Sequence, residues 1–199
     1  YATKNNGFGG LDARLMINSP LHQRHLENLE RWNKEGLFVY KGRGNHADAS
    51  FYSGECAITM GSSGTLANIR RNAKFEYATS TLPYYEGTPD APQNTAIGGA
   101  SLWAMAGKPD AENRCVAEFF NFLSDPKVQA ANHQRTGYLP VTMKAFELSK
   151  ESGYYDKNPG SDVAVKQMLK TTEKSRGIRL GNLPAIRTIV EIGRASCRE

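Results

Sequence analysis

The residues best suited to chemistry form a glycine–serine turn, Gly61-Ser62-Ser63-Gly64, between a predicted apolar strand and a predicted helix. The first N–H groups of a helix lack intrahelical partners and carry partial positive charge, so a helix start binds anions. Ser62 and, more weakly, Ser63 add hydroxyl donors, and the flanking glycines let a ligand approach the backbone. A serine that only caps the helix would explain the same pattern. The turn matches neither a Walker loop nor a nucleophile elbow.

Two further side chains are placed to contact a polar ligand. Tyr138 precedes a Leu-Pro corner, which would fix a hydroxyl and a ring face that suit a polyol or a sugar. Arg187 falls in the first turn of a predicted helix, where its charge opposes the helix dipole, so a ligand or carboxylate partner is expected. Core packing of Tyr138 and a solvated surface position for Arg187 are the alternatives.

The histidines form no recognisable catalytic or metal-binding pattern. His22 and His25 are three residues apart on a predicted helix but have no third ligand in view. His46 and His133 have no identifiable partners, and no Ser/His/Asp or Cys/His arrangement has meaningful spacing. We therefore predict no catalytic residues, no metal and no cofactor.

Composition indicates a folded protein and excludes several classes. Of the 199 residues 39% are hydrophobic and 10% aromatic, which excludes a disordered tail, and the 19 glycines show no collagen period. No stretch approaches the roughly 18 apolar residues of a membrane span. The net charge of +5 is spread along the chain, so no nucleic-acid partner is expected. Cys56 and Cys115 lack a C-x-x-C motif, and we expect two buried thiols.

We expect both ends of the chain to differ from those of a complete gene product. Tyr1 opens the chain without a visible targeting signal. Residues 192–199 resemble the translation of a sequencing adapter, and we expect them to be a non-native scar. Excluding this scar lowers the net charge from +5 to +4 and removes Cys197. We expect residues 1–191 to be an interior fragment of a longer protein.

Strand and helix signals alternate along the chain, which predicts an α/β fold. Strands are predicted at residues 13–17, 56–60, 75–82 and within 96–106. Helices are predicted at residues 20 to about 36, about 47–52, after Gly64 to Arg71, around 116–123, 126–136, 143–151, 162–169 and from 182 onward. Residues 5–10 and 84–94 are rich in turn formers and are predicted to be loops.

Five short motifs occur in order along residues 1–191. They are Ser62-Ser63-Gly64-x-Leu66-Ala67-Asn68-Ile69-Arg70, Asp90-Ala91-Pro92-Gln93-Asn94, Gly98-Gly99-Ala100-Ser101-Leu102-Trp103, Thr136-Gly137-Tyr138-Leu139-Pro140 and Leu180-Gly181-Asn182-x-Pro184-x-Ile186-Arg187. In order and spacing the series resembles the periplasmic sn-glycerol-3-phosphate-binding proteins of ABC importers. These belong to the maltose-binding-like class of solute receptors.

The resemblance implies an α/β fold of the type II periplasmic-binding-protein kind, in which two lobes close on a ligand. This chain would hold most of the second lobe and a crossing piece of the first. Residues 1–97 and 143–191 would belong to the second lobe, and residues 98–142 to the first. Without the rest of the first lobe, the apolar face of the predicted helix around residues 116–123 would be exposed.

The resemblance also implies which residues bind the ligand. Ser62, Gly99, Tyr138 and Arg187 fall on the family's ligand-contacting positions, and the role of Gly99 rests on the resemblance alone. The implied function is that of a periplasmic, monomeric receptor without enzymatic activity. It would bind sn-glycerol 3-phosphate, or a glycerophosphodiester such as glycerophosphocholine, and deliver it to the permease subunits of an ABC importer. Arg187 would pair with the phosphate.

Two alternative functions stay open. A receptor of the same fold for a neutral oligosaccharide would give Arg187 no counter-charge. A phosphodiesterase or esterase that uses Ser62 would need a base within reach of Ser62, and no histidine pattern supplies one.

Overall fold

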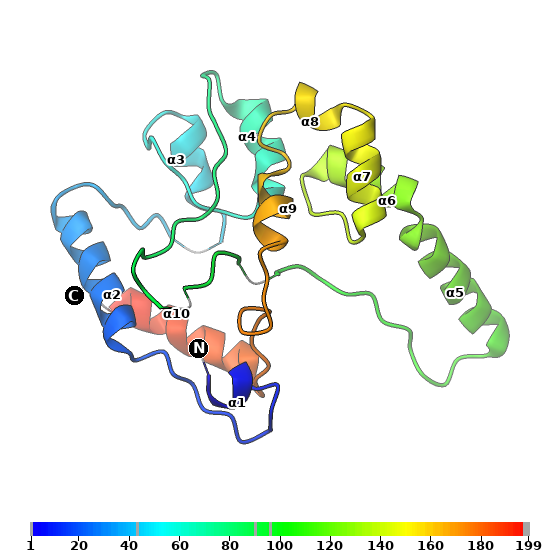
Figure 1. Ribbon diagram of the computed structural model, residues 1–199, viewed down its shortest axis with the longest axis horizontal. Helices are drawn as coiled ribbons and strands as arrows, with labels where there is room; N and C mark the ends of the chain where they lie inside the picture. Colours follow the sequence, from blue (N-terminus) through cyan, green and yellow to red (C-terminus); the bar gives the residue numbers. More distant parts are fainter. Residues whose placement is uncertain (1, 43, 90, 96, 197–199) are drawn as a thin grey trace. The chain divides into compact units, whose positions relative to one another are not determined.

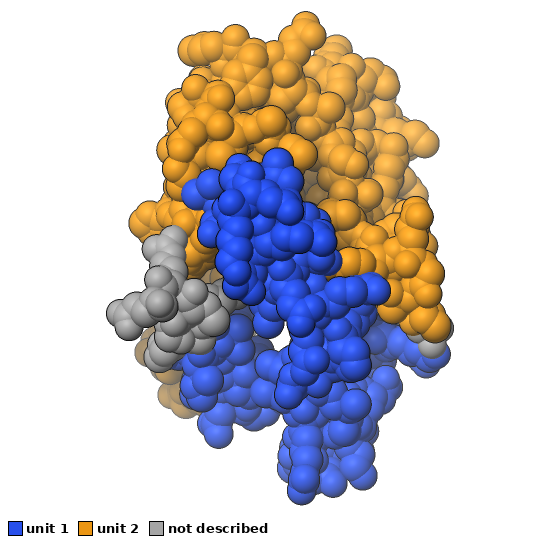
Figure 2. Space-filling view, turned by 90° about the vertical axis from the view of Figure 1, so that its left-hand side faces the viewer, with its two compact units in different colours: residues 1–39, 172–199 blue, residues 40–171 orange. Residues whose placement is uncertain are grey.

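The computed structural model describes residues 2–42, 44–89, 91–95 and 97–196, with side chains described up to residue 190. Asp90 and Ala96, which belong to a predicted motif and a predicted strand, lie outside the described residues, as do residues 197–199 of the predicted scar. The chain divides into two compact units, residues 1–39 with 172–199 and residues 40–171 (Figure 2). We call these unit 1 and unit 2. The predicted lobe segments and the predicted scar stay predictions.

Unit 1 combines helices from both ends of the chain. They are α1 (Thr3–Asn6), α2 (Pro20–Lys34) and α10 (Leu183–Ser196) (Figure 1). α2 begins where the sequence predicts, because the Ser19 hydroxyl accepts the N–H of His22 at 3.4 Å and Pro20 occupies the first helical position. α10 likewise begins at the predicted Asn-Leu-Pro signal.

The turn at α1 joins the two chain segments of unit 1. Residues 4–6 have left-handed backbone angles, with φ between 51° and 56°, where the sequence predicts only a loop from residue 5. The Arg179 N–H donates to the Asn6 carbonyl at 2.9 Å. Gly7 has a φ of 87°, and a Cβ there would lie 1.8 Å from the Arg179 carbonyl oxygen. Only glycine therefore allows the backbone around residue 179 to approach this turn.

Unit 2 is built from short helices that mostly begin and end at the predicted signals. They are α3 (Asp48–Tyr52), the 3-10 turn η1 (Ser63–Thr65), α4 (Leu66–Asn72), α5 (Asp110–Ser124), α6 (Pro126–Thr136), α7 (Met143–Glu151), α8 (Tyr154–Lys157) and α9 (Val163–Met168). Asp125 caps α6 by accepting the N–H groups of Lys127 and Val128, and Gly137 ends it with a φ of 79°. The sequence did not predict α8.

The predicted strands are absent from the described residues. Residues 13–17, 56–60, 75–82 and 97–106 are irregular, and the β contact in the described part of the chain is one isolated bridge between Ala2 and Leu15. A strand persists only when a neighbouring strand satisfies its backbone N–H and C=O groups. These four strand predictions are therefore wrong for this structure, because the described residues supply no such neighbour.

The interior of unit 2 is a polar network rather than a large apolar core. His133 is 1% exposed and Ser149 fully buried. Tyr154 accepts an Nη1–H of Arg70 at 3.1 Å and donates its own O–H to the Gln134 carbonyl at 3.0 Å. Gln134 in turn donates to the Ser149 hydroxyl at 3.2 Å. These bonds connect α4, α6, α7 and α8, which fixes the elements around the candidate site.

Apolar side chains are exposed on α5 and on the segment before it. Phe119 and Phe122 of α5 are 52% and 59% exposed, and Trp103 is 84% exposed. Val116, Phe120 and Leu123 are half-buried. The sequence predicts exposure of the face formed by residues 116, 119, 120 and 123, and this holds for Phe119 but not for the three half-buried residues.

Buried Gln167 in α9 takes the place of a strand neighbour for the segment at Leu82. The Leu82 N–H donates to the Gln167 side-chain oxygen at 3.2 Å. The Gln167 amide group donates to the carbonyls of Leu82 at 3.4 Å and Gln93 at 3.2 Å. One side chain thus holds both ends of the predicted loop at residues 84–94.

Replacing Gln167 with Met should detach this loop while preserving side-chain volume. The substitution leaves three backbone groups unpaired, and we expect a loss of about 1–3 kcal/mol in unfolding free energy. Faster hydrogen exchange at the Leu82 amide is the local readout. Lys150→Ala, which removes an exposed lysine from α7, is the control and should leave that exchange rate unchanged. An unchanged Leu82 rate in Gln167→Met would contradict the assignment.

Candidate functional site

The turn at Gly61–Gly64 is organised by Ser62. The Ser62 hydroxyl accepts the N–H of Gly64 at 3.3 Å, and its carbonyl accepts both the N–H and the hydroxyl of Thr65, at 3.0 and 2.7 Å. Ser62 therefore caps η1, which precedes α4 in place of the direct helix start that the sequence predicts. Its side chain is exposed. Because the hydroxyl acts as an acceptor in the cap, its O–H can still donate to a ligand.

Tyr138 packs directly on this turn. A Cβ on Gly64 would lie 2.9 Å from Cζ of the Tyr138 ring, so only glycine lets the ring approach so closely. A Cβ on Gly137 would in turn lie 2.8 Å from the Ser63 carbonyl oxygen. Tyr138 nevertheless stays 55% exposed. The structure thus brings together two motifs that are separate in the sequence, the serine turn and the Tyr138 corner.

His133 holds the backbone of Tyr138 in place. Its Nδ1 lies 2.6 Å from the Tyr138 carbonyl oxygen and its Nε2 lies 3.0 Å from the Tyr155 hydroxyl. A neutral ring satisfies both contacts when Nδ1–H donates to the carbonyl and Nε2 accepts the Tyr155 O–H. Sequence reasoning missed this role. The sequence feature that could have indicated it is the position of His133 in the last turn of α6, before Gly137 ends the helix. Side chains in such a turn can hydrogen-bond to the backbone at the helix end.

Burial keeps both side chains of this pair neutral. Desolvation lowers the pKa of His133, and the hydrogen bond to the Tyr138 carbonyl only partly opposes that effect. Burial likewise raises the pKa of Tyr155 to about 12. Neutral His133 and protonated Tyr155 are the forms that the hydrogen-bond pattern requires.

Gly99 and Arg187 are not joined to this cluster by any described contact. Gly99 is exposed, has a φ of 126°, and no described atom lies within 4 Å of where its Cβ would be. Arg187 is exposed as the fifth residue of α10 in unit 1, just beyond the first turn in which the sequence predicts it, and no described side chain supplies a carboxylate partner. The ligand-contacting roles of both residues stay predictions.

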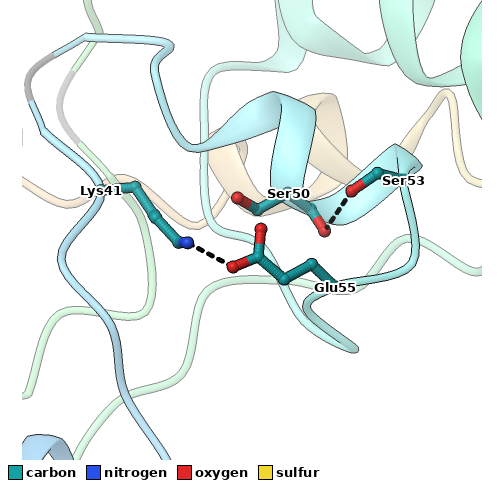
Figure 3. Close-up of polar contacts among 4 residues, drawn as sticks. All are labelled: Lys41, Ser50, Ser53 and Glu55. Atoms are coloured by element: carbon teal, nitrogen blue, oxygen red, sulfur yellow. Dashed lines mark hydrogen bonds and ion pairs between the residues drawn. The ribbon is translucent and has the colours of Figure 1, made fainter.

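An ion pair fixes the loop that precedes the turn. Glu55 pairs with Lys41, and Ser53 donates to the Ser50 carbonyl at 3.4 Å (Figure 3). The hydrogen bond from Lys41 lowers the pKa of Glu55, and the same bond raises the pKa of Lys41. Cys56, whose N–H donates to the Ser50 carbonyl at 2.8 Å, is thereby held near this loop.

Both described cysteines are free thiols. Cys56 is half-buried and Cys115 is exposed on α5, so the expectation of two buried thiols is wrong for Cys115. The physical reason is that Cys115 lies on a helix whose faces lack covering elements among the described residues.

Two negative findings apply to the described part of the chain. Its histidines, cysteines and acidic residues include no cluster of three or more that could hold a metal ion. It also contains no helix with the length and hydropathy needed to cross a membrane.

The buried histidine should make stability depend on pH. An unfolded chain binds a proton at His133 near the ordinary histidine pKa of 6.5, whereas the folded protein resists that proton until lower pH. The unfolding free energy should therefore fall as pH decreases below about 6.5. In His133→Phe this pH dependence should weaken, and loss of both hydrogen bonds should cost about 1–3 kcal/mol. Melting temperatures between pH 5 and 8 measure both effects.

His46→Gln is the matched control, because His46 is an exposed histidine of the same unit. In this variant the unfolding free energy should depend on pH as it does in the wild-type protein. If the stability of His133→Phe depends on pH as strongly as that of the wild-type protein, His133 is not the group that causes the pH dependence.

Comparison with known proteins places the chain among solute receptors. Residues 2–161 match the family model described as bacterial extracellular solute-binding protein. The chain is 52% identical over 192 residues to the sn-glycerol-3-phosphate-binding periplasmic protein UgpB of Yersinia enterocolitica, and 51% identical over 193 residues to that of Salmonella typhimurium. Each alignment covers 96% of this chain and 44% of the relative, so the chain spans less than half the length of the curated relatives it matches.

A solved structure agrees with this placement. The crystal structure of UgpB from Mycobacterium tuberculosis in complex with glycerophosphocholine superposes with a TM-score of 0.71 at 27% identity. The match covers 89% of this chain and 43% of that one, and it confirms the predicted type II periplasmic-binding-protein fold in incomplete form. The chain belongs to the family of bacterial extracellular solute-binding proteins.

Proposed function

We propose that this chain is part of an extracytoplasmic receptor for sn-glycerol 3-phosphate or a glycerophosphodiester such as glycerophosphocholine. The observation that carries the proposal is the packing of Tyr138 on the Ser62 turn, which sets a serine hydroxyl and an aromatic side chain side by side. The relatives named as sn-glycerol-3-phosphate-binding and the relative solved with glycerophosphocholine support this ligand class. We assign delivery to ABC permease subunits and a periplasmic location by the same relationship.

In this proposal the ligand is bound by five residues with different roles. Ser62 donates a hydrogen bond to the phosphate or the glycerol part, and Ser63 contributes more weakly. Tyr138 offers its hydroxyl and the exposed part of its ring. Arg187 pairs with the phosphate, and the backbone at Gly99 approaches the ligand where a side chain would clash. Residues 1–97 and 143–191 form the second lobe, and residues 98–142 cross to the first.

We infer that the receptor performs no chemistry on its ligand. An enzyme that used Ser62 would need a base beside the Ser62 hydroxyl. That hydroxyl accepts the Gly64 N–H, and His133, the buried histidine of the cluster, has both ring nitrogens engaged with Tyr138 and Tyr155. These bonds favour binding alone over the esterase alternative. The charge of exposed Arg187 favours an anionic ligand over a neutral oligosaccharide.

Removing Arg187 should test the phosphate contact directly. Titration calorimetry on a full-length protein that carries residues 1–191 should show binding of glycerol 3-phosphate and almost none of glycerol. Arg187→Ala should lose about 1.5–3 kcal/mol of binding free energy, the range for a charged hydrogen bond. Arg114→Ala, which removes an exposed arginine from α5, is the control and should bind normally. Equal affinity for glycerol and glycerol 3-phosphate would contradict the proposal.

Gly64→Ala tests the role of the Tyr138 ring. The added methyl would lie 2.9 Å from Cζ, so the ring must move away from the Ser62 turn. We expect roughly tenfold weaker ligand binding, equivalent to loss of about one hydrogen bond. Gly181→Ala is the control, since nothing described lies within 4 Å of a Cβ at that position. Unchanged affinity in Gly64→Ala would remove Tyr138 from the site.

A further inference from the structure

Side chains from the last turn of α6 hold both backbone groups of Tyr138. The Tyr138 N–H donates to the Thr136 hydroxyl oxygen at 3.2 Å, and the Thr136 O–H is itself donated to the Asn132 carbonyl at 2.7 Å. The Tyr138 carbonyl oxygen lies 2.6 Å from Nδ1 of His133. The backbone of His133 also takes part, because its carbonyl accepts the N–H of Gly137 at 2.8 Å. The residue that presents the ring is therefore anchored to α6 through both its N–H and its carbonyl.

His133 provides an anchor that the Leu-Pro corner does not. Pro140 restricts the backbone of the residue before it, Leu139, and not that of Tyr138. The ψ angle of Tyr138 is therefore limited by the hydrogen bond that Nδ1–H of His133 donates to the Tyr138 carbonyl. A rotation about this angle would move the ring relative to the Ser62 turn.

His133 acts from the interior of unit 2 and does not reach a ligand itself. It is 1% exposed, whereas Tyr138 is 55% exposed. Its ring packs against those of Tyr154 and Tyr155, with centroid distances of 5.8 and 5.7 Å. Its Nε2 lies 3.0 Å from the Tyr155 hydroxyl, so both ring nitrogens are used within the protein. Any influence of His133 on binding therefore passes through Tyr138.

Building on the proposed function, we propose that His133 is a positioning residue for the ligand site. Its Nδ1–H holds the Tyr138 carbonyl, and this bond keeps the ring close to Gly64, where an added Cβ would lie 2.9 Å from Cζ. A ligand that contacts both Ser62 and Tyr138 needs them at one separation. Because the bond orders the ring before the ligand arrives, less conformational freedom is lost on binding and the affinity is higher.

Two substitutions at this position separate the bond to Tyr138 from the rest of the histidine. Asparagine places its amide nitrogen as many bonds from Cβ as Nδ1 is, so His133→Asn can still donate to the Tyr138 carbonyl. Glutamine places its amide group one bond further out, near the position of Nε2. His133→Gln can therefore accept the Tyr155 O–H but loses the bond to Tyr138. Each variant loses the ring and one buried hydrogen bond, so a merely structural role would affect both alike.

Titration calorimetry on a full-length protein that carries residues 1–191 measures the effect on binding, with glycerol 3-phosphate and glycerophosphocholine as the probes. His133→Asn should bind with close to wild-type affinity. His133→Gln should bind roughly threefold to tenfold more weakly, the range of one net hydrogen bond. Tyr154→Phe is the control for lost stability, because Tyr154 packs on the same ring and its O–H is donated to the Gln134 carbonyl at 3.0 Å. It should melt at a lower temperature but bind as the wild-type protein does.

A proton NMR signal reports the position of the ring without any ligand. One Hα of Gly64 points along the direction of the missing Cβ, toward the Tyr138 ring, so the ring current shifts its signal. Tyr138→Leu, which has no ring, gives the unshifted position of that signal. The shift should persist in His133→Asn and decrease in His133→Gln.

The outcomes distinguish the two proposals. If the wild-type protein binds neither probe, the proposed function fails and the role of His133 in binding fails with it. If it binds them but His133→Gln binds as tightly as His133→Asn, or keeps the full Gly64 shift, only this inference is overturned. A nitrogen-15 spectrum of the wild-type protein needs no variant, so it decides the matter even if His133→Gln does not fold. It should show the proton of the neutral His133 ring on Nδ1, and a proton on Nε2 instead would overturn the inference.

Discussion

The close packing of the serine turn against the Tyr138 corner is the contact on which the candidate site depends. Gly64 admits the Tyr138 ring and Gly137 admits the Ser63 carbonyl, at separations that a Cβ on either glycine would reduce below 3 Å. Two backbone segments far apart in the sequence can therefore meet without side chains between them. Ser62 and Tyr138 are neighbours because of these two contacts, and the proposed ligand site follows from that arrangement.

Hydrogen bonds between buried side chains of unit 2 maintain this contact. His133 fixes the Tyr138 carbonyl, Tyr155 fixes His133, and the network through Tyr154 and Arg70 extends to α4. Few large apolar side chains are buried in the described residues. Hydrogen bonds between polar groups therefore hold many of the elements in place.

Helices were predictable and strands were not, for a physical reason. A helix such as α6 contains its own start and end signals, because the Asp125 cap and the left-handed Gly137 act on neighbouring residues. A strand at residues 56–60 depends on a partner elsewhere, and the described residues offer none. Ser62 and Tyr138 were likewise identifiable from the residues next to them in the sequence. The role of His133 was not, because its hydrogen-bond partners are Tyr155 in α8 and Tyr138 beyond the end of α6.

By itself the sequence determined the start and end signals of helices such as α2, α6 and α7, the ligand-capable residues and the likeness to glycerol-phosphate receptors, because each rests on local residue order. Tertiary structure decided that the serine turn and Tyr138 form one cluster and that His133 is buried and neutral. These features depend on distances between segments that are remote in the chain, and packing around glycines and buried hydrogen bonds sets those distances.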